Sequence, residues 1–256
     1  ACRLPVLCHE ANAVPGLANR VAARFAAHVA VAFPAARLPR AEVIGLPLRP
    51  ALAGLDRAAR RPSARAAFGL PETGPVLLVS GGSQGARRLN EAVAGALGRL
   101  LAQGVSVLHV TGPANFAAAG APCRDAATGA CYCPVAYLDA MEQAYAAADL
   151  MLGRAGAATV VEVAVLGLPA ILVPLPHGNG EQAENAAGLV LAGGAVLVPD
   201  ADFDADRLLC ETAGLLVPGR LAQMAAAGPA LMPRDAADKL AALALAAVRA
   251  ASVRRP

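Results

Sequence analysis

Aromatic residues are scarce in this sequence, which has no tryptophan, 3% aromatics overall and Lys239 as its one lysine. Proteins that bind single-stranded nucleic acid stack the bases on aromatic side chains inside a basic groove. Here the net charge is only +3 and the arginines are spread along the chain. We therefore expect no nucleic acid among the partners.

Long apolar runs are missing as well. A membrane-spanning helix needs roughly 20 consecutive apolar residues, and glycines and prolines between residues 167 and 176 interrupt the best candidate. This excludes a spanning helix there but leaves a peripheral membrane contact open. No secretory signal peptide is visible.

Cysteines with metal-binding spacing are also missing, because none of the six cysteines forms a C-x-x-C pair. Cys123, Cys131 and Cys133 are close in sequence, but no histidine or second pair lies near them. We expect no bound metal and reduced thiols, as in a cytoplasmic protein.

What the chain does have is a regular alternation of short apolar strands and helices along its 256 residues. Such alternation predicts an α/β fold with a doubly wound parallel sheet. In these folds the ligand binds at the carboxyl ends of the strands. Within this pattern His109 is expected to be a hydrogen-bonded core residue, and the arginines of 57–65 a solvated helix face. Asp139 with Glu142 resembles a capping box for the helix that follows.

The stretch 149–182 carries the clearest pattern of strands, helix and glycine turns in the chain. It reads as a strand over 149–153, a turn at 154–156, a helix over 157–166 ended by Gly167, and a strand over 170–174. The helix N-terminus offers free backbone N–H groups and a favourable dipole, which predicts an anion site. Glu162 lies little more than one turn into the helix, so its carboxylate is expected to bind sugar hydroxyls of the same ligand.

A second glycine-rich segment, GGSQGA at 81–86, follows the predicted strand 76–80 and opens a helix over 87–101. This is the usual arrangement for holding an oxyanion. It is not a Walker loop, because the Lys-[Ser/Thr] ending is missing.

One competing motif points to a different enzyme class. Gly178, Gly180 and Ala183 fit G-x-G-x-x-A, and Asp200 follows about 20 residues later, as in a dinucleotide-binding fingerprint. The alternative is therefore an NAD-dependent oxidoreductase. The acidic run 200–211 resembles a calcium loop without its glycine, and Asp204 or Asp206 is expected to cap the next helix instead.

Taken together, several segments resemble the MurG family of glycosyltransferases. In chain order they are HEANAVPGLAN at 9–19, GLPLR at 45–49, GGSQGAR at 81–87 with Asn90, YLDAM at 137–141, RAGAATVVE at 154–162 and HGNGEQAEN at 177–185. The resemblance implies a GT-B fold with two Rossmann-like domains. It also implies transfer of N-acetylglucosamine from UDP-N-acetylglucosamine to lipid I, which makes lipid II for peptidoglycan. The reaction would take place at the cytoplasmic face of the plasma membrane and require no cofactor or bound divalent metal.

The resemblance also implies roles for individual residues. Leu138 corresponds to the contact with uracil, Glu162 to the ribose contact, and Gln182 and Asn12 to positions at the sugar. Arg49 and Arg154 correspond to further donor-site or structural positions, with Arg154 also helping to stabilise the leaving group. The implied set of substrate-binding residues is Asn12, Arg49, Ser83, Leu138, Arg154, Ala157, Ala158, Thr159, Val160, Val161, Glu162 and Gln182.

The chain departs from the family pattern at its N-terminal end, where residues 4–33 match only the tail of the family's first domain. The family's first glycine-rich loop, its histidine and its membrane-facing patch have no match. Ala11 replaces a usual glutamine and Leu46 a usual asparagine. His9 and Glu10 are the remaining candidates for proton transfer.

These matches divide the chain into three parts. Residues 1–48 are expected to be a remnant of the acceptor-side domain with the hinge, 49–232 a UDP-sugar-binding domain, and 233–256 a helix returning to the first part. We expect 1–48 to be loosely held, swapped into another chain or prone to aggregation. Besides a truncated transferase and an oxidoreductase, a non-catalytic UDP-sugar-binding module remains an alternative.

Overall fold

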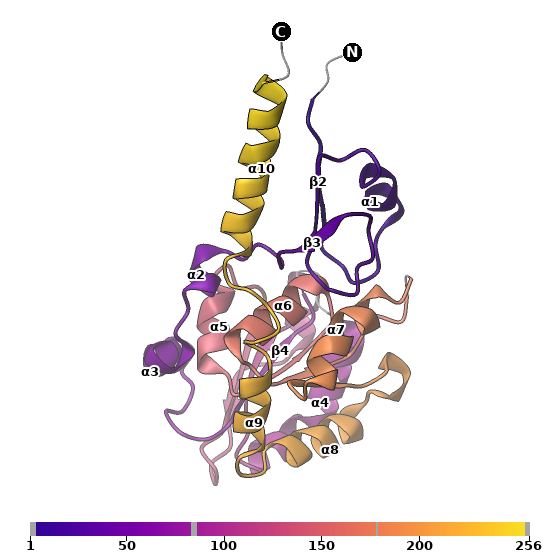
Figure 1. Ribbon diagram of the computed structural model, residues 1–256. Coiled ribbons are helices and arrows are strands. Elements are labelled where there is room, and N and C mark those ends of the chain that lie inside the picture. Colours follow the sequence, from indigo (N-terminus) through magenta and orange to yellow (C-terminus); the bar gives the residue numbers. More distant parts are fainter. Residues whose placement is uncertain (1–3, 83–85, 178, 254–256) are drawn as a thin grey trace.

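The computed structural model describes residues 4–82, 86–177 and 179–253, and it contains two separate sheets (Figure 1). The smaller sheet consists, within the described residues, of β1 (Leu7–Glu10), β2 (His28–Val31) and β3 (Ala41–Val43), paired in parallel in that order. Helix α1 (Leu17–Ala22) connects β1 to β2.

The larger sheet has the order β10-β9-β8-β4-β5-β7-β6 among the described strands. Its strands are β4 (Val76–Ser80), β5 (Ser106–Val110), β6 (Cys123–Arg124), β7 (Cys131–Val135), β8 (Leu150–Gly153), β9 (Ala170–Leu172) and β10 (Ala195–Leu197). All described pairs are parallel except the β6–β7 hairpin. The predicted doubly wound parallel fold is confirmed.

Helices cover both faces of the larger sheet. Side chains of α4 (Arg87–Ala102) and α8 (Ala205–Leu215) pack on one face with Leu77 and Val79 of β4. The opposite face, with Leu78, carries α3 (Arg57–Ala67), α5 (Met141–Ala147), α6 (Ala157–Leu166) and α7 (Glu181–Leu191). Because β4 is apolar from Val76 to Val79 and buried along its whole length, both faces can be covered, as a central parallel strand requires.

The remaining helices lie at the connections. They are α2 (Pro50–Ala53), α9 (Arg220–Ala227), α10 (Ala236–Val253) and the 3₁₀ turns η1 (Pro113–Ala118) and η2 (Asp200–Asp202). Helix α8 is capped by Asp204, whose side chain accepts from the N–H of Arg207, so that expectation is confirmed.

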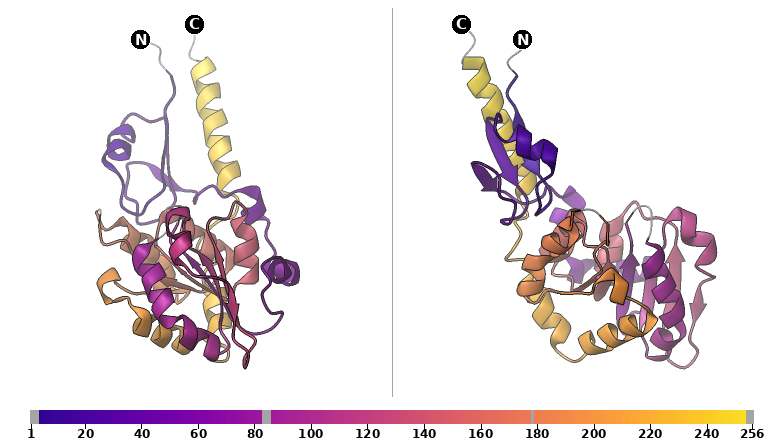
Figure 2. Two further views of the ribbon diagram at one scale, coloured as in Figure 1. Left: turned by 180° about the vertical axis from the view of Figure 1, so that it is seen from behind. Right: turned by 90° about the vertical axis from the view of Figure 1, so that its right-hand side faces the viewer.

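Two segments connect the sheets, and they meet at Gly45. This residue has φ +88°, and a β-carbon on it would lie 2.8 Å from Pro233, which precedes α10. Glycine therefore fits both the left-handed backbone and the close approach. Beyond this crossing α10 packs against β1 and β2, with α1 on the other side of the small sheet (Figures 1 and 2). The three-part division of the chain stays a prediction.

The expectation of a solvated arginine face on α3 is wrong for Arg57 and Arg65, although Arg60 is exposed as expected. Arg57 donates to the carbonyls of Tyr145, Ala148, Leu166 and Gly167 at the ends of α5 and α6. Arg65 is 2% exposed and pairs with Asp149, which Arg61 also contacts. Burial lowers the pKa of Arg57 to about 10, with Arg61 nearby contributing. Arg57 and Arg65 thus bind carbonyls at the C-terminal ends of α5 and α6, where cations are favourable.

The expected capping box at Asp139 is also wrong. The residue at the N-cap of α5 is Ala140, and no side-chain cap is formed there among the described residues. His109, by contrast, is the expected core residue, because it is 2% exposed and contacts Tyr132 and Asn90. Within the part of the chain that the structure describes, no helix is long and apolar enough to cross a membrane.

Candidate active site

The N-terminus of α6 lies at the carboxyl edge of the larger sheet, directly after β8. Gly153 ends β8, and a β-carbon there would lie 3.0 Å from the carbonyl oxygen of Ser80 on β4. Gly156 is the N-cap, and none of the described side chains caps it. Since the first intrahelical bond joins Val160 N–H to the Gly156 carbonyl, the N–H groups of 157–159 are left to bind an anion.

The six predicted residues of α6 differ in what they can offer. Ala157, Ala158 and Thr159 form the first turn and keep some exposure. Val160 and Val161 are 0% exposed and belong to the core. A ligand cannot reach their side chains, which serve to fix the helix on the sheet.

Glu162 is half-buried, and its Oε2 accepts a hydrogen bond of 2.6 Å from the hydroxyl of Tyr145 on α5. Burial raises the pKa of Glu162, against the opposing effects of the Tyr145 bond and of Arg49. The bond to Tyr145 uses one carboxylate oxygen and leaves Oε1 to other donors. Glu162 is five positions after Ala157, a rise of about 7.5 Å along the helix axis, so one ligand can span both.

Leu138 lies in the loop between β7 and α5, and Arg49 holds that loop. The Nη1 of Arg49 donates to the carbonyl of Asp139 over 2.9 Å, and its Nη2 lies 3.8 Å from Glu142. Leu138 itself is half-buried against the core. Arg49 therefore links its own segment to the loop that carries Leu138, and its charge also acts on Glu162.

Arg154 follows Gly153, and its Nη1 is bound within the fold, while its buried Nε has no partner among the described residues. Its Nη1 lies 2.6 Å from Asp200 and also donates to the carbonyls of Val173 and Pro174. Asp200 in turn lies 3.0 Å from Nε of Arg88, at the start of α4. The charge of Arg154 is therefore matched within the fold.

Gln182 and Asn12 both have one end of the side chain fixed. Gln182 Oε1 accepts from the N–H of Leu175, and Asn12 Oδ1 accepts from Asn185 over 3.2 Å. Among the described residues the amide NH₂ group of Gln182 is left to donate to a ligand, whereas the side chain of Asn12 also bonds to Glu10. Asn185 also accepts from Ala13 N–H over 2.7 Å and lies 3.4 Å from the Ala155 carbonyl.

The two candidates for proton transfer lie on β1 with different surroundings. His9 Nε2 is 3.0 Å from the carbonyl of Gly45, so this nitrogen must donate and Nδ1 is left as the acceptor. Glu10 is 3% exposed and accepts from Asn12 N, Gly16 N and Asn19 Nδ2, each over 2.9 Å. Burial favours a raised pKa, but these bonds outweigh it and hold the pKa of Glu10 below its usual range.

A carboxylate with three donors and a lowered pKa is a poor base at neutral pH. The geometry therefore favours Glu10 as the anchor of the loop 11–16. The catalytic roles of His9 and Glu10 stay predictions.

Three residues of this edge were missed from the sequence: Tyr145, Asn185 and Arg88. Nothing in the alanine-rich sequence around Tyr145 indicates its role. The sequence does give an indication for Asn185, because a lone amide on the apolar face of α7 must find a buried hydrogen-bond partner. Ser83, predicted to bind the pyrophosphate, lies outside the described residues.

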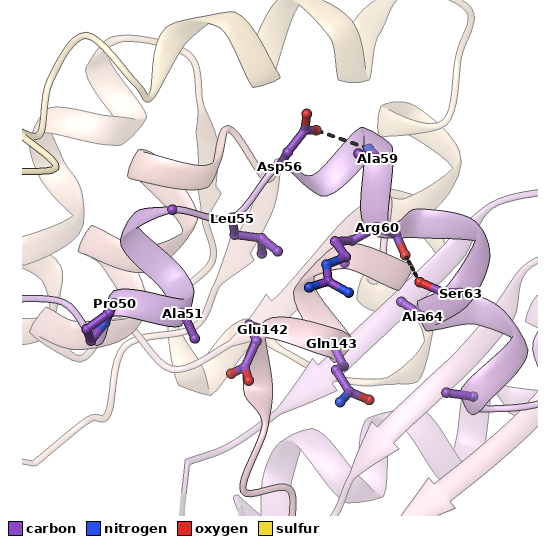
Figure 3. Close-up of a pocket in the computed structure, with 13 residues that line it drawn as sticks. Pro50, Ala51, Leu55, Asp56, Ala59, Arg60, Ser63, Ala64, Glu142 and Gln143 are labelled. Atoms are coloured by element: carbon purple, nitrogen blue, oxygen red, sulfur yellow. Dashed lines mark hydrogen bonds between the residues drawn. The ribbon is translucent and has the colours of Figure 1, made fainter.

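A cavity of about 650 Å³ lies away from this edge, between α2, α3 and α5 (Figure 3). Figure 3 shows Glu142 and Gln143 of α5 on one side and Leu55 and Arg60 on the other. Most of its remaining lining is alanine and proline. None of its lining residues comes from α6, so this cavity is not the predicted anion site. Among the described residues, no three His, Cys, Asp or Glu side chains are grouped to hold a metal ion.

Comparisons with known proteins agree with this geometry. Residues 76–240 match the family model described as the glycosyltransferase family 28 C-terminal domain. The chain is 29% identical to the crystal structure of Acinetobacter baumannii MurG with a TM-score of 0.76, covering 93% of this chain and 66% of that one. The chain belongs to the MurG family.

Curated relatives in the MurG family carry the name UDP-N-acetylglucosamine--N-acetylmuramyl-(pentapeptide) pyrophosphoryl-undecaprenol N-acetylglucosamine transferase. The Cutibacterium acnes protein is 55% identical over 245 residues, which cover 93% of this chain and 66% of the relative. The Mycobacterium tuberculosis protein is 53% identical over 253 residues, covering 98% and 61%. The chain thus spans slightly less than two thirds of the length of these relatives.

Membership of the MurG family decides against the dinucleotide-binding motif. The NAD-dependent alternative is wrong, since Asp200 pairs with Arg154 and Arg88 and is not free to bind a ribose. Strand β9 also ends at Leu172, while α7 begins at Glu181, which is too long a connection for the tight turn of the fingerprint. Gly178 of that motif lies outside the described residues.

Proposed function

We propose that this chain binds UDP-N-acetylglucosamine and contributes to transfer of its N-acetylglucosamine to lipid I, forming lipid II. The observation that carries the proposal is the uncapped N-terminus of α6 with Glu162 about 7.5 Å along the same helix. The free N–H groups suit a diphosphate, and the half-buried carboxylate suits ribose hydroxyls. The names of the curated relatives support the same donor and acceptor.

In this proposal the hydroxyl of lipid I attacks C1 of the sugar and UDP leaves with inversion. Positive helix dipole at α6 offsets the charge that develops on the leaving diphosphate. The chemistry needs no bound metal, because backbone donors meet the diphosphate. Lipid I places the reaction at the inner face of the cell membrane, and residues 1–48 with 233–256 would form the side that faces the acceptor.

The test is Glu162→Ala, with UDP affinity measured by calorimetry. Losing hydrogen bonds to a charged group costs about 1.5–3 kcal/mol, or roughly tenfold to a hundredfold in affinity. Glu184→Ala is the matched control, because Glu184 is an exposed carboxylate on the neighbouring helix α7. Unchanged UDP affinity in Glu162→Ala would contradict the ribose assignment.

A turnover assay with a lipid I analogue separates the transferase from a non-catalytic UDP-sugar-binding module. Product formation by the 256-residue chain supports transfer, and UDP binding without product supports the binding module.

A further inference from the structure

Asp200 is the one described residue that joins the two strand–loop–helix units of the predicted diphosphate site. Its Oδ1 lies 2.6 Å from Arg154, two residues before the N-cap of α6, and its Oδ2 lies 3.0 Å from Arg88 in the first turn of α4. The carboxylate is 11% exposed and Arg154 13%. Strands β8 and β4, which lead into these helices, are neighbours in the sheet.

We propose that Asp200 is a positioning residue for diphosphate binding, which sets the N-terminus of α6 and that of α4 at a fixed separation. The inference rests on the proposed function, since it assumes a ligand whose two phosphates meet both helix starts. It assigns no ligand contact to Asp200. The carboxylate acts through Arg88 and Arg154.

The physical reason is the pairing of charges. Without Asp200, two guanidinium groups that now share one carboxylate would face each other unpaired. Arg154 is mostly buried and held by the carbonyls of Val173 and Pro174, so it cannot turn away. Arg88 is 45% exposed, and its Nη1 also donates to the carbonyl of Phe203 over 3.4 Å, so without Asp200 the first turn of α4 keeps no charged link to the start of α6. An uncompensated charge in a buried setting is costly, so the two helix starts would separate.

The experiment compares Asp200→Ala with Asp206→Ala in the 256-residue chain. Asp206 makes an ion pair of the same kind with Arg99 of α4 over 2.7 Å, but both side chains are exposed. Affinities for UDP and for uridine are measured by calorimetry or by ligand-observed NMR. Asp200→Asn is the second variant, because it keeps the size of the side chain and one acceptor oxygen should Asp200→Ala fail to fold.

We expect Asp200→Ala to weaken UDP binding about tenfold or more, because one of the two displaced helix starts then loses a hydrogen bond to the charged diphosphate, while uridine affinity stays within about twofold. Asp206→Ala should change neither. In Asp200→Ala/Arg88→Ala, part of the UDP affinity should return, because the second unpaired cation is gone. Equal weakening of UDP and uridine would show general damage to the site and overturn the proposal.

Failure of the proposed function is recognised separately. If the unmodified chain binds no UDP, the donor assignment fails. The positioning role of Asp200, called the clamp below, is then tested by hydrogen exchange without ligand. Asp200→Ala should speed exchange in the peptides covering 86–92 and 154–163. Unchanged exchange in either peptide overturns the clamp, as does unchanged UDP affinity in a variant of a chain that binds UDP.

Discussion

Replacing Asn185 by alanine should release the loop 11–16 from the larger domain. Asn185 is 1% exposed on α7, and its amide bonds to Ala13 N–H and to Asn12, 172 and 173 residues away in sequence. It also lies 3.4 Å from the carbonyl of Ala155, just before the α6 N-cap. One buried side chain therefore holds the N-terminal segment against the start of α6.

The free-energy cost of Asn185→Ala follows from the hydrogen bonds that are lost and the buried donor that is left without a partner. Each neutral hydrogen bond contributes about 0.5–1.5 kcal/mol net, and a buried donor without a partner costs about 1–3 kcal/mol. Ala13 is 4% exposed, so its N–H is such a donor. We expect about 3 kcal/mol in total, a smaller value than the sum because the bonds are not independent.

Native-state hydrogen exchange measures this locally. A change of about 3 kcal/mol corresponds to roughly a hundredfold loss of protection at the Ala13 amide, while the strands β4, β5 and β8 should keep theirs. Asn179→Ala is the control, because Asn179 is exposed and bonds only within its own turn among the described residues. If protection at residues 11–16 is unchanged, or is already absent in the unmodified chain, the N-terminal segment is not held by Asn185.

Two further predictions concern stability. Burial lowers the pKa of His109 from 6.5 to about 4, so the unfolded chain binds the proton first as pH falls. The free energy of unfolding should therefore drop by about 3 kcal/mol between pH 6.5 and pH 4. Denaturant unfolding at both pH values tests this, and the same pH dependence of stability in His109→Gln would refute the attribution to His109. Gly167→Ala should destabilise by about 2–4 kcal/mol in thermal or urea unfolding, because φ is +57° and the added β-carbon would lie 2.6 Å from the Ala225 carbonyl. Gly188→Ala, inside α7 with open space around it, should instead stabilise by about 0.5–1 kcal/mol, and equal losses in both variants would refute the steric argument.

The backbone parts of the site could be predicted because their signals are local. Helix α6 was placed at its observed bounds, since an apolar run ended by Gly167 and Pro169 leaves little choice of register. Gly167 adopts the left-handed C-cap that the pattern indicated. The anion-binding helix start follows directly from these bounds.

Side-chain partners could not be predicted in the same way. Charged residues are usually exposed, which predicts solvent around Arg57 and Arg65. Both instead bind carbonyls or a carboxylate that lie 82 to 110 residues away, and Arg65 also binds two carbonyls in the nearby segment 71–72. Asp200 fitted a dinucleotide pattern by spacing alone, and its pairing with Arg154 depends on how β8, β9 and β10 sit side by side. Composition and spacing hold no information about such long-range pairs.

These pairings also change which groups can meet a diphosphate. Arg154 was expected to stabilise the leaving group, but its charge is matched by Asp200, and Arg49 lies beside Glu142. The N–H groups of Ala157, Ala158 and Thr159 have no intrahelical partner, because the first bond within α6 starts at the N–H of Val160. The Nε of Arg154 is also a buried donor without a partner among the described residues. A helix N-terminus carries roughly half a positive charge, and its donors are already oriented before the ligand arrives. The proposed leaving-group stabilisation therefore depends on the backbone of α6, and on Asp200 for keeping that backbone in place.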